Sequence, residues 1–112
     1  MNEILKTIYD AIDEKKGENI RMLDIKDVTV IAEYFIIASG NNENQVKAIA
    51  DNVTEELGKK YAMSPKHVEG YNHAEWILLD YGDYVIHIFD KEQRIFYDLE
   101  RIWRDGKEIE VK

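Results

Sequence analysis

Apolar residues recur at intervals of three and four positions in two segments, which predicts two amphipathic helices. The first segment spans residues 2–16, and Asn2 is placed to act as its N-cap. The second spans residues 43–61 and follows Asn42, which stands three positions before Gln45, the spacing of a capping box. Both helices therefore have a polar start and one apolar stripe that must be buried against another element.

Short apolar runs between and after these segments predict strands. The run at residues 34–39 is apolar almost throughout, which is typical of a strand covered on both faces. Residues 67–71 form the weakest run, and we expect it at a sheet edge. The predicted strands are residues 20–25, 34–39, 67–71, 75–81 and 84–89.

A helical repeat returns at residues 92–103 and predicts a terminal helix or two short turns. The resulting order predicts an α/β fold, with a mixed sheet of about five strands and flanking helices. The second strand and the long helix begin a crossover that returns to the sheet, and the last two long strands form a hairpin. No repeat or interior linker divides the chain, so we expect residues 1–112 to form a single domain.

The hairpin is the most informative feature, because its turn predicts its register. Gly82 and Asp83 separate two apolar runs, and a glycine in the first position suits a type II′ turn. Side chains alternate between the two faces of a sheet, so the turn sorts them into two sets. The set without charge is expected beneath the helices, and it comprises Ile77, Leu79, Tyr81, Tyr84, Ile86 and Ile88.

The opposite face has a mixed composition, comprising Trp76, Leu78, Asp80, Val85, His87 and Phe89. A dry core would not accept Asp80 and His87 unless they were paired, whereas a solvent face would not carry so many large apolar groups. Two interpretations stay open from this pattern alone. The face is either an aromatic-rich interaction surface or a surface covered by the first or the terminal helix.

The charge of the chain limits its partners. Fifteen Lys and Arg residues stand against 23 Asp and Glu residues, a net charge of -8. Nucleic-acid affinity depends on cationic side chains that neutralise phosphates, so we expect little direct contact with nucleic acid. An acidic surface fits a basic protein partner, or it serves only to keep the chain soluble.

The chain has no cysteine, which excludes disulfides and thiolate metal sites and fits a reducing compartment. No apolar run reaches the ~18 residues of a membrane span. The first residues lack the basic-then-apolar order of a signal peptide. We therefore expect a cytoplasmic location without membrane contact.

Candidate catalytic groups are sparse. Asp80 and Asp83 resemble a metal-binding carboxylate pair, and Ser39-Gly40 stands at a strand-to-helix junction that could hold a phosphate. Together they outline a nucleotidyltransferase-like site, but a third carboxylate and a P-loop lysine are missing. The histidines have no metal-ligand spacing. We expect no enzyme activity, no cofactor and no metal.

Four segments together resemble one protein family. They are AEYFIIASG at 32–40, NQVKAIAD at 44–51, EGYNHAEWILLDYGDYVIHIF at 69–89, and RIFYDLERIW at 94–103. In this order they are similar to the ribosomal silencing factor family, also called RsfS or Iojap-like, over nearly the whole chain. One departure is Glu33, where the family usually has aspartate.

The resemblance implies a mixed-sheet domain similar to nucleotidyltransferases but without known catalysis. It implies binding to the large ribosomal subunit through ribosomal protein L-fourteen, which blocks joining of the small subunit and represses translation when nutrients are scarce. Organelle relatives assist large-subunit assembly, and members tend to form homodimers. Two alternatives stay open: a metal-dependent nucleotidyltransferase, and a homodimeric module that uses the same sheet face for self-association.

The resemblance also implies which residues meet the partner. Trp76, Leu78 and Asp80 match the family's W-x-L-x-D positions. Tyr81 matches the next position, although the predicted register puts it on the core side. The hairpin geometry adds His87 and Phe89 as expected partner-binding residues, because they share a face with Trp76.

Overall fold

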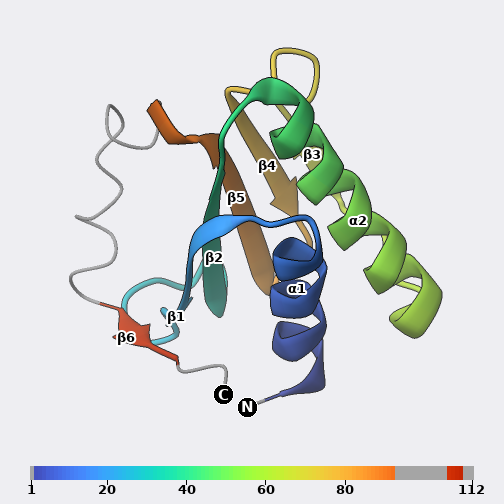
Figure 1. The fold of residues 1–112 in the computed structure, drawn as a ribbon. Coiled ribbons are helices and arrows are strands. Elements are labelled where there is room, and N and C mark those ends of the chain that lie inside the picture. Colours follow the sequence, from blue (N-terminus) through green and yellow to red (C-terminus); the bar gives the residue numbers. More distant parts are fainter. Residues whose placement is uncertain (1, 93–105, 110–112) are drawn as a thin grey trace.

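The computed structural model describes residues 2–92 and 106–109, and these form an α/β fold (Figure 1). One helix begins the fold and a longer one follows the second strand. Both helices lie on one side of a twisted sheet. The elements are α1 (Glu3–Glu14), β1 (Glu18–Asp24), β2 (Tyr34–Gly40), α2 (Glu43–Tyr61), β3 (His67–Glu69), β4 (Trp76–Asp80), β5 (Tyr84–Asp90) and β6 (Lys107–Glu108).

The described strands form one mixed sheet in the order β3-β4-β5-β2-β1-β6. β2 and β5 pair in parallel, and the other neighbours are antiparallel. The predicted α/β class, the crossover from β2 to β5 and the edge position of β3 are therefore confirmed. β6 was not predicted, because it has two residues and no apolar pattern. The predicted helix at 92–103 lies, from residue 93 on, outside the described residues.

Side-chain caps begin both helices where the sequence predicts. The Asn2 side chain accepts a hydrogen bond from the backbone of Leu5 at 2.7 Å, and Asn42 accepts one from Gln45 at 2.9 Å. The reciprocal bond of the predicted capping box is displaced by one residue, since the Gln45 side chain accepts from Asn41. Its amide donates to the carbonyls of Lys15 and Lys16, which ties the end of α1 to the start of α2.

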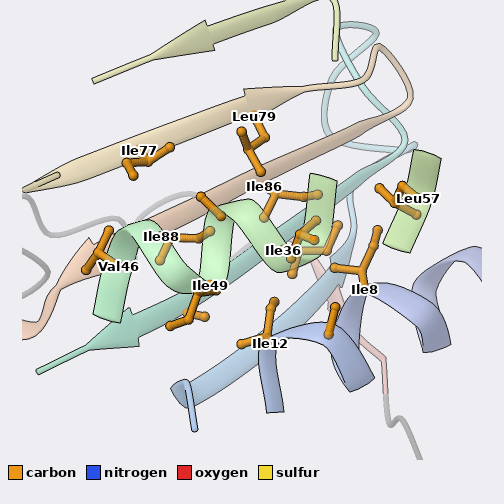
Figure 2. Close-up of a cluster of buried hydrophobic side chains, with 14 of the residues drawn as sticks. Ile8, Ile12, Ile36, Val46, Ile49, Leu57, Ile77, Leu79, Ile86 and Ile88 are labelled. Atoms are coloured by element: carbon orange, nitrogen blue, oxygen red, sulfur yellow. The ribbon is translucent and has the colours of Figure 1, made fainter. Parts of the chain in front are cut away.

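The main core lies between the two helices and the facing side of the sheet, which we call the inner face. Figure 2 shows Ile8 and Ile12 of α1 and Ile49 of α2 packed close to strand residues such as Ile36 and Ile86. All five of these side chains are fully buried. The inner-face set predicted from the hairpin belongs to this core, with Tyr84 partly buried at its margin.

The β4–β5 hairpin has the predicted register. Trp76 lies opposite Phe89, and Asp80 opposite Val85. Gly82 has a φ of +88°, the left-handed value that the first position of a type II′ turn requires and that glycine adopts without strain. The turn therefore places Trp76, Leu78 and Asp80 on the face of the sheet that points away from both helices.

Candidate interaction surface on the outer sheet face

A second apolar cluster covers the outer face, the side of the sheet opposite the helices. Part of it comes from the β1–β2 loop, drawn in cyan in Figure 1 on the side away from α1 and α2. We call it the outer-face cluster. Its buried members are Leu23, Ile25, Ala32, Ile37, Val85 and Phe89, and its partly buried members are Phe35, Trp76 and Leu78.

Burial of the outer face differs between neighbouring strands. Along β4 the residues alternate between partly exposed and buried, so its outer side chains reach solvent. The five central residues of β5 are all buried, so that strand is covered on both faces. The accessible part of this hairpin's outer face is therefore a strip along β4, formed by Trp76, Leu78 and Asp80.

Trp76 is held in a defined orientation. Its ring stacks on Phe89, with ring centres 4.9 Å apart and planes inclined by 26°. Its indole N–H donates a hydrogen bond to Nδ1 of His87 at 3.1 Å. An aromatic side chain fixed at both its ring face and its polar atom has little freedom to lose on binding, which is the property of a good interface anchor.

His87 is buried beneath this strip and is 5% exposed. Because its Nδ1 accepts from Trp76, the proton of the neutral ring is on Nε2, which has no hydrogen-bond partner among residues 2–92 and 106–109. Phe35 packs against the imidazole edge-on, with ring centres 5.0 Å apart. Burial lowers the pKa of His87 to about 4, so the ring is neutral at pH 7.

Asp80 stands at the end of the strip beside the hairpin turn. One carboxylate oxygen accepts a hydrogen bond from the backbone N–H of Gly82 at 2.8 Å, an Asx turn that supports the hairpin. The side chain is only partly buried. The hydrogen bond to the turn is a structural reason for an aspartate at position 80. The carboxylate also places negative charge at one end of the strip.

The six residues expected to bind the partner thus fall into three groups. Trp76, Leu78 and Asp80 are partly exposed on the outer face. Phe89 is fully buried and His87 nearly so, because the outer-face cluster covers them, and direct contact by either is not supported. Tyr81 belongs to the inner core, where burial raises its pKa, so it points away from this surface.

β2 also contributes to this face, which was not predicted. Phe35 and Ile37 belong to the outer-face cluster, and the parallel register sets them beside Val85 and His87. The apolar run at 34–39 gave no register of its own, since nearly all of its residues are apolar. The two-residue spacing of Phe35 and Ile37 was a usable signal, but only once β2 is known to pair with β5.

The chain matches the sequence model of a family described as "Ribosomal silencing factor during starvation", over residues 1–112. The chain belongs to the ribosomal silencing factor family. Proteins named ribosomal silencing factor RsfS match from Halalkalibacterium halodurans, 38% identical over 98% of this chain and 93% of that protein, and from Bacillus subtilis, 39% identical over 92% and 86%. A chloroplastic Iojap protein of Arabidopsis thaliana is 36% identical over 90% of this chain and 41% of that protein.

A solved structure supports the same relationship. The crystal structure of a protein from Bacillus halodurans matches with a TM-score of 0.85 and 36% identity, over 96% of this chain and 97% of that chain. Membership in the ribosomal silencing factor family assigns the chain to translation regulation and implies a ribosome-associated role. The likeness to nucleotidyltransferases stays a prediction.

The nucleotidyltransferase-like site outlined from the sequence is not assembled. Ser39 pairs with Phe89 at one end of β5, whereas Asp80 pairs with Val85 near the other end. These two positions of β5 are four residue steps apart, roughly 13 Å at 3.3 Å per residue. Among residues 2–92 and 106–109, no three His, Cys, Asp or Glu side chains are grouped to hold a metal.

The hollow at the Gly40 end of β2 also disfavours a phosphate. Its volume is about 380 Å³, and of its lining residues in the described part of the chain three are acidic and none is Lys or Arg. A phosphate there would meet negative charge without a counter-charge from the lining. The lining residues are Asn41, Asn42, Glu43, Asn44, Asp90 and Glu92.

Proposed function

We propose that the chain binds the large ribosomal subunit through ribosomal protein L-fourteen, and that it does so with the strip of Trp76, Leu78 and Asp80. Bound there, residues 1–112 act as one domain that blocks joining of the small subunit by occupying space. Translation is repressed without turnover of a substrate. Neither helix in the described part of the chain could cross a bilayer, and a ribosomal partner fits action in the cytoplasm.

The observation that carries this proposal is the partly exposed Trp76 on a sheet face that neither α1 nor α2 covers. Tryptophan is enriched among residues that dominate binding energy, especially where its neighbours exclude water. Phe89 and His87 supply that support from below, by ring stacking and by accepting the indole hydrogen bond. Their proposed role is therefore to position Trp76 and not to touch the partner.

The charge of the chain supports a basic partner. The net charge is -8, and Asp80 lies at one end of the strip. A net negative chain with a carboxylate at the end of its apolar strip attracts a protein rich in Lys and Arg and repels the phosphates of ribosomal RNA. This arrangement favours docking on a ribosomal protein over direct contact with nucleic acid.

Replacement of Trp76 with alanine tests the proposal. We expect binding to purified large subunits, and to isolated ribosomal protein L-fourteen, to weaken by about 2 kcal/mol or more, roughly thirtyfold. Co-sedimentation measures the first and a direct titration measures the second. Unchanged binding of Trp76→Ala to both would refute the assignment of this strip.

A second variant separates binding from folding, because Trp76 also packs on Phe89 within the chain. Leu78→Ser changes a partly exposed residue and should weaken binding with little loss of stability. Val68→Ser is the matched control, since Val68 pairs with Leu79 of the inner-face set and is 47% exposed. The alternative is that the strip serves only self-association. In that case the original chain forms dimers and does not bind ribosomes, and Leu78→Ser dissociates the dimers.

A further inference from the structure

The β1–β2 loop exposes apolar side chains that the strip on β4 does not include. Val30 is 102% exposed and Ile31 is 81% exposed, the two most exposed large hydrophobic side chains among the described residues. Val28, at 41%, lies beside them. We call residues 28–31 the loop tip. Scattered single apolar residues are common on protein surfaces, but two consecutive β-branched side chains that are mostly in solvent need an explanation.

Hydrogen bonds hold the loop that carries this tip. The backbone N–H of Ile25 donates to the carbonyl of Glu33 at 2.9 Å, which closes the base of the loop. The N–H groups of Val28 and Thr29 both donate to the Ile25 carbonyl at 3.0 Å. The N–H of Ile31 donates to the Thr29 hydroxyl at 3.2 Å. These hydrogen bonds fix the backbone of the loop that carries Val30 and Ile31.

The loop tip is continuous with the docking strip. Ala32, the residue after the tip, is buried in the outer-face cluster together with Val85, and Val85 lies directly across from Asp80. The N–H groups of Glu33 and Tyr34 donate to the carbonyl of Asp83 in the hairpin turn, both at 2.9 Å. The tip and the strip therefore belong to one surface, joined by the outer-face cluster and the hairpin turn.

Charge around the tip indicates the kind of molecule that covers it. Asp24, Asp27 and Glu33 lie on or beside the loop, and Asp83 lies in the adjoining turn. Among the described residues, Lys26 pairs with Asp24 at 3.7 Å and Lys107 with Asp27 at 4.0 Å, and the Lys66 side chain lies against Gly82 of the turn. The excess of acid opposes an anionic membrane or a nucleic acid and fits a cationic protein surface.

We infer that Val30 and Ile31 form a second anchor, which enters an apolar recess bordered by Lys or Arg on the same basic protein that covers Trp76 and Leu78. This inference rests on the proposed function and extends it, because it adds a contact on a different element from the W-x-L-x-D strip. The partner then bridges the strip on β4 and the loop tip at the end of β1.

The test is a double variant, Val30→Ser with Ile31→Ser, titrated against purified large ribosomal subunits. We expect the dissociation constant to rise by about tenfold to a hundredfold, because two exposed aliphatic side chains lose their burial in the complex. Val68→Ser is the control for loss of an exposed valine elsewhere, and it should bind like the original chain. The thermal midpoint of the double variant should stay unchanged.

Trp76→Ala, measured in parallel, separates the two proposals. If Trp76→Ala weakens binding and the loop-tip variant does not, the second anchor is refuted and the proposed function stands. If the original chain does not bind large subunits, the proposed function is refuted. If it binds and Trp76→Ala and Leu78→Ser bind equally well, the assignment of the strip is refuted, whatever the tip does. A fall of several degrees in the thermal midpoint of the loop-tip variant would show that the tip packs within its own chain, which also overturns the inference.

Two further measurements address other occupants of the tip. Flotation with phosphatidylcholine vesicles should recover neither the original chain nor the variant, and vesicle binding that is lost in the variant would replace the inference with a membrane contact. Sedimentation should give the same oligomeric state for both proteins. A shift from dimer to monomer with normal ribosome binding would assign the tip to a second copy of the chain.

Discussion

Alternate residues of the β4–β5 hairpin point to opposite faces of the sheet, and the two faces differ in how completely they are buried. The inner-face set predicted from the hairpin consists of apolar residues and tyrosines, and the helices cover it with aliphatic groups. On the outer face a histidine is buried among aromatic rings, and the coverage thins from β5 to β4 until Trp76 and Leu78 are partly exposed. The inner face stabilises the fold, whereas the outer face supports a surface.

The largest expected effect on stability comes from the inner face. Ile88 is fully buried on β5 and lies between Ile77 and Ala38 of the neighbouring strands. Ile88→Ala should lower the free energy of unfolding by about 2–5 kcal/mol, because it removes buried methyl groups and leaves a cavity. Urea unfolding measures this, and a loss below 1 kcal/mol would contradict the role of the inner face as the main core.

The next effect is specific to the outer face and depends on pH. The pKa of His87 is lowered from 6.5 to about 4 by burial, so the native chain resists the proton that the unfolded chain accepts. The contribution of neutral His87 to the free energy of unfolding is fully present above pH 6.5 and is lost as the pH falls toward 4. This loss approaches about 1.4 kcal/mol per pH unit, or about 3 kcal/mol in total.

His87→Asn isolates this contribution from the carboxylates that also titrate in acid. The asparagine amide does not titrate, and its oxygen can still accept from the Trp76 indole. We expect the free energy of unfolding of the variant to fall less steeply between pH 6.5 and 4 than that of the original chain. If the free energy of unfolding fell equally steeply with pH in both proteins, protonated His87 would have solvent access or a partner. That result would contradict the burial of His87 in the structure.

The smallest expected loss of stability is that of a substitution at Leu78 on the outer face. Leu78 is on β4, directly across from His87, but it is only partly buried. Leu78→Ala should therefore cost less unfolding free energy than Ile88→Ala, about 1 kcal/mol, since part of the Leu78 side chain already meets water in the native chain. If it destabilised the chain as much as Ile88→Ala does, the strip would be part of a core and could not be reserved for a partner.

Local sequence patterns predicted most of the fold. Both helices begin at the expected asparagine caps, and the hairpin register follows from Gly82 and the two-residue turn. These features depend on residues close together in the chain, where capping and turn geometry act directly. The two-residue strand β6 escaped prediction, because its pairing with β1 depends on residues more than eighty positions away.

The candidate site was only partly predictable. The pattern identified which side chains share the outer face, but it could not say how deeply each is covered. Phe89 and His87 were expected to contact the partner and are buried, because the outer-face cluster, which includes Phe35 of β2 and residues of the β1–β2 loop, covers them. The exposure of Val30 and Ile31 was likewise not predictable, because it depends on how the loop between β1 and β2 lies against distant parts of the chain.

The sequence by itself determined the helices, the hairpin and the division of its side chains between two faces, since these follow from periodicities of a few residues and from turn chemistry. Family membership also follows from sequence alone, through motifs spread along the chain. Only the tertiary structure decided that Trp76 and Leu78 are partly accessible while Phe89 is not. Burial depends on which distant segments meet on a face, and the parallel pairing of β2 with β5 and the path of the β1–β2 loop settle that.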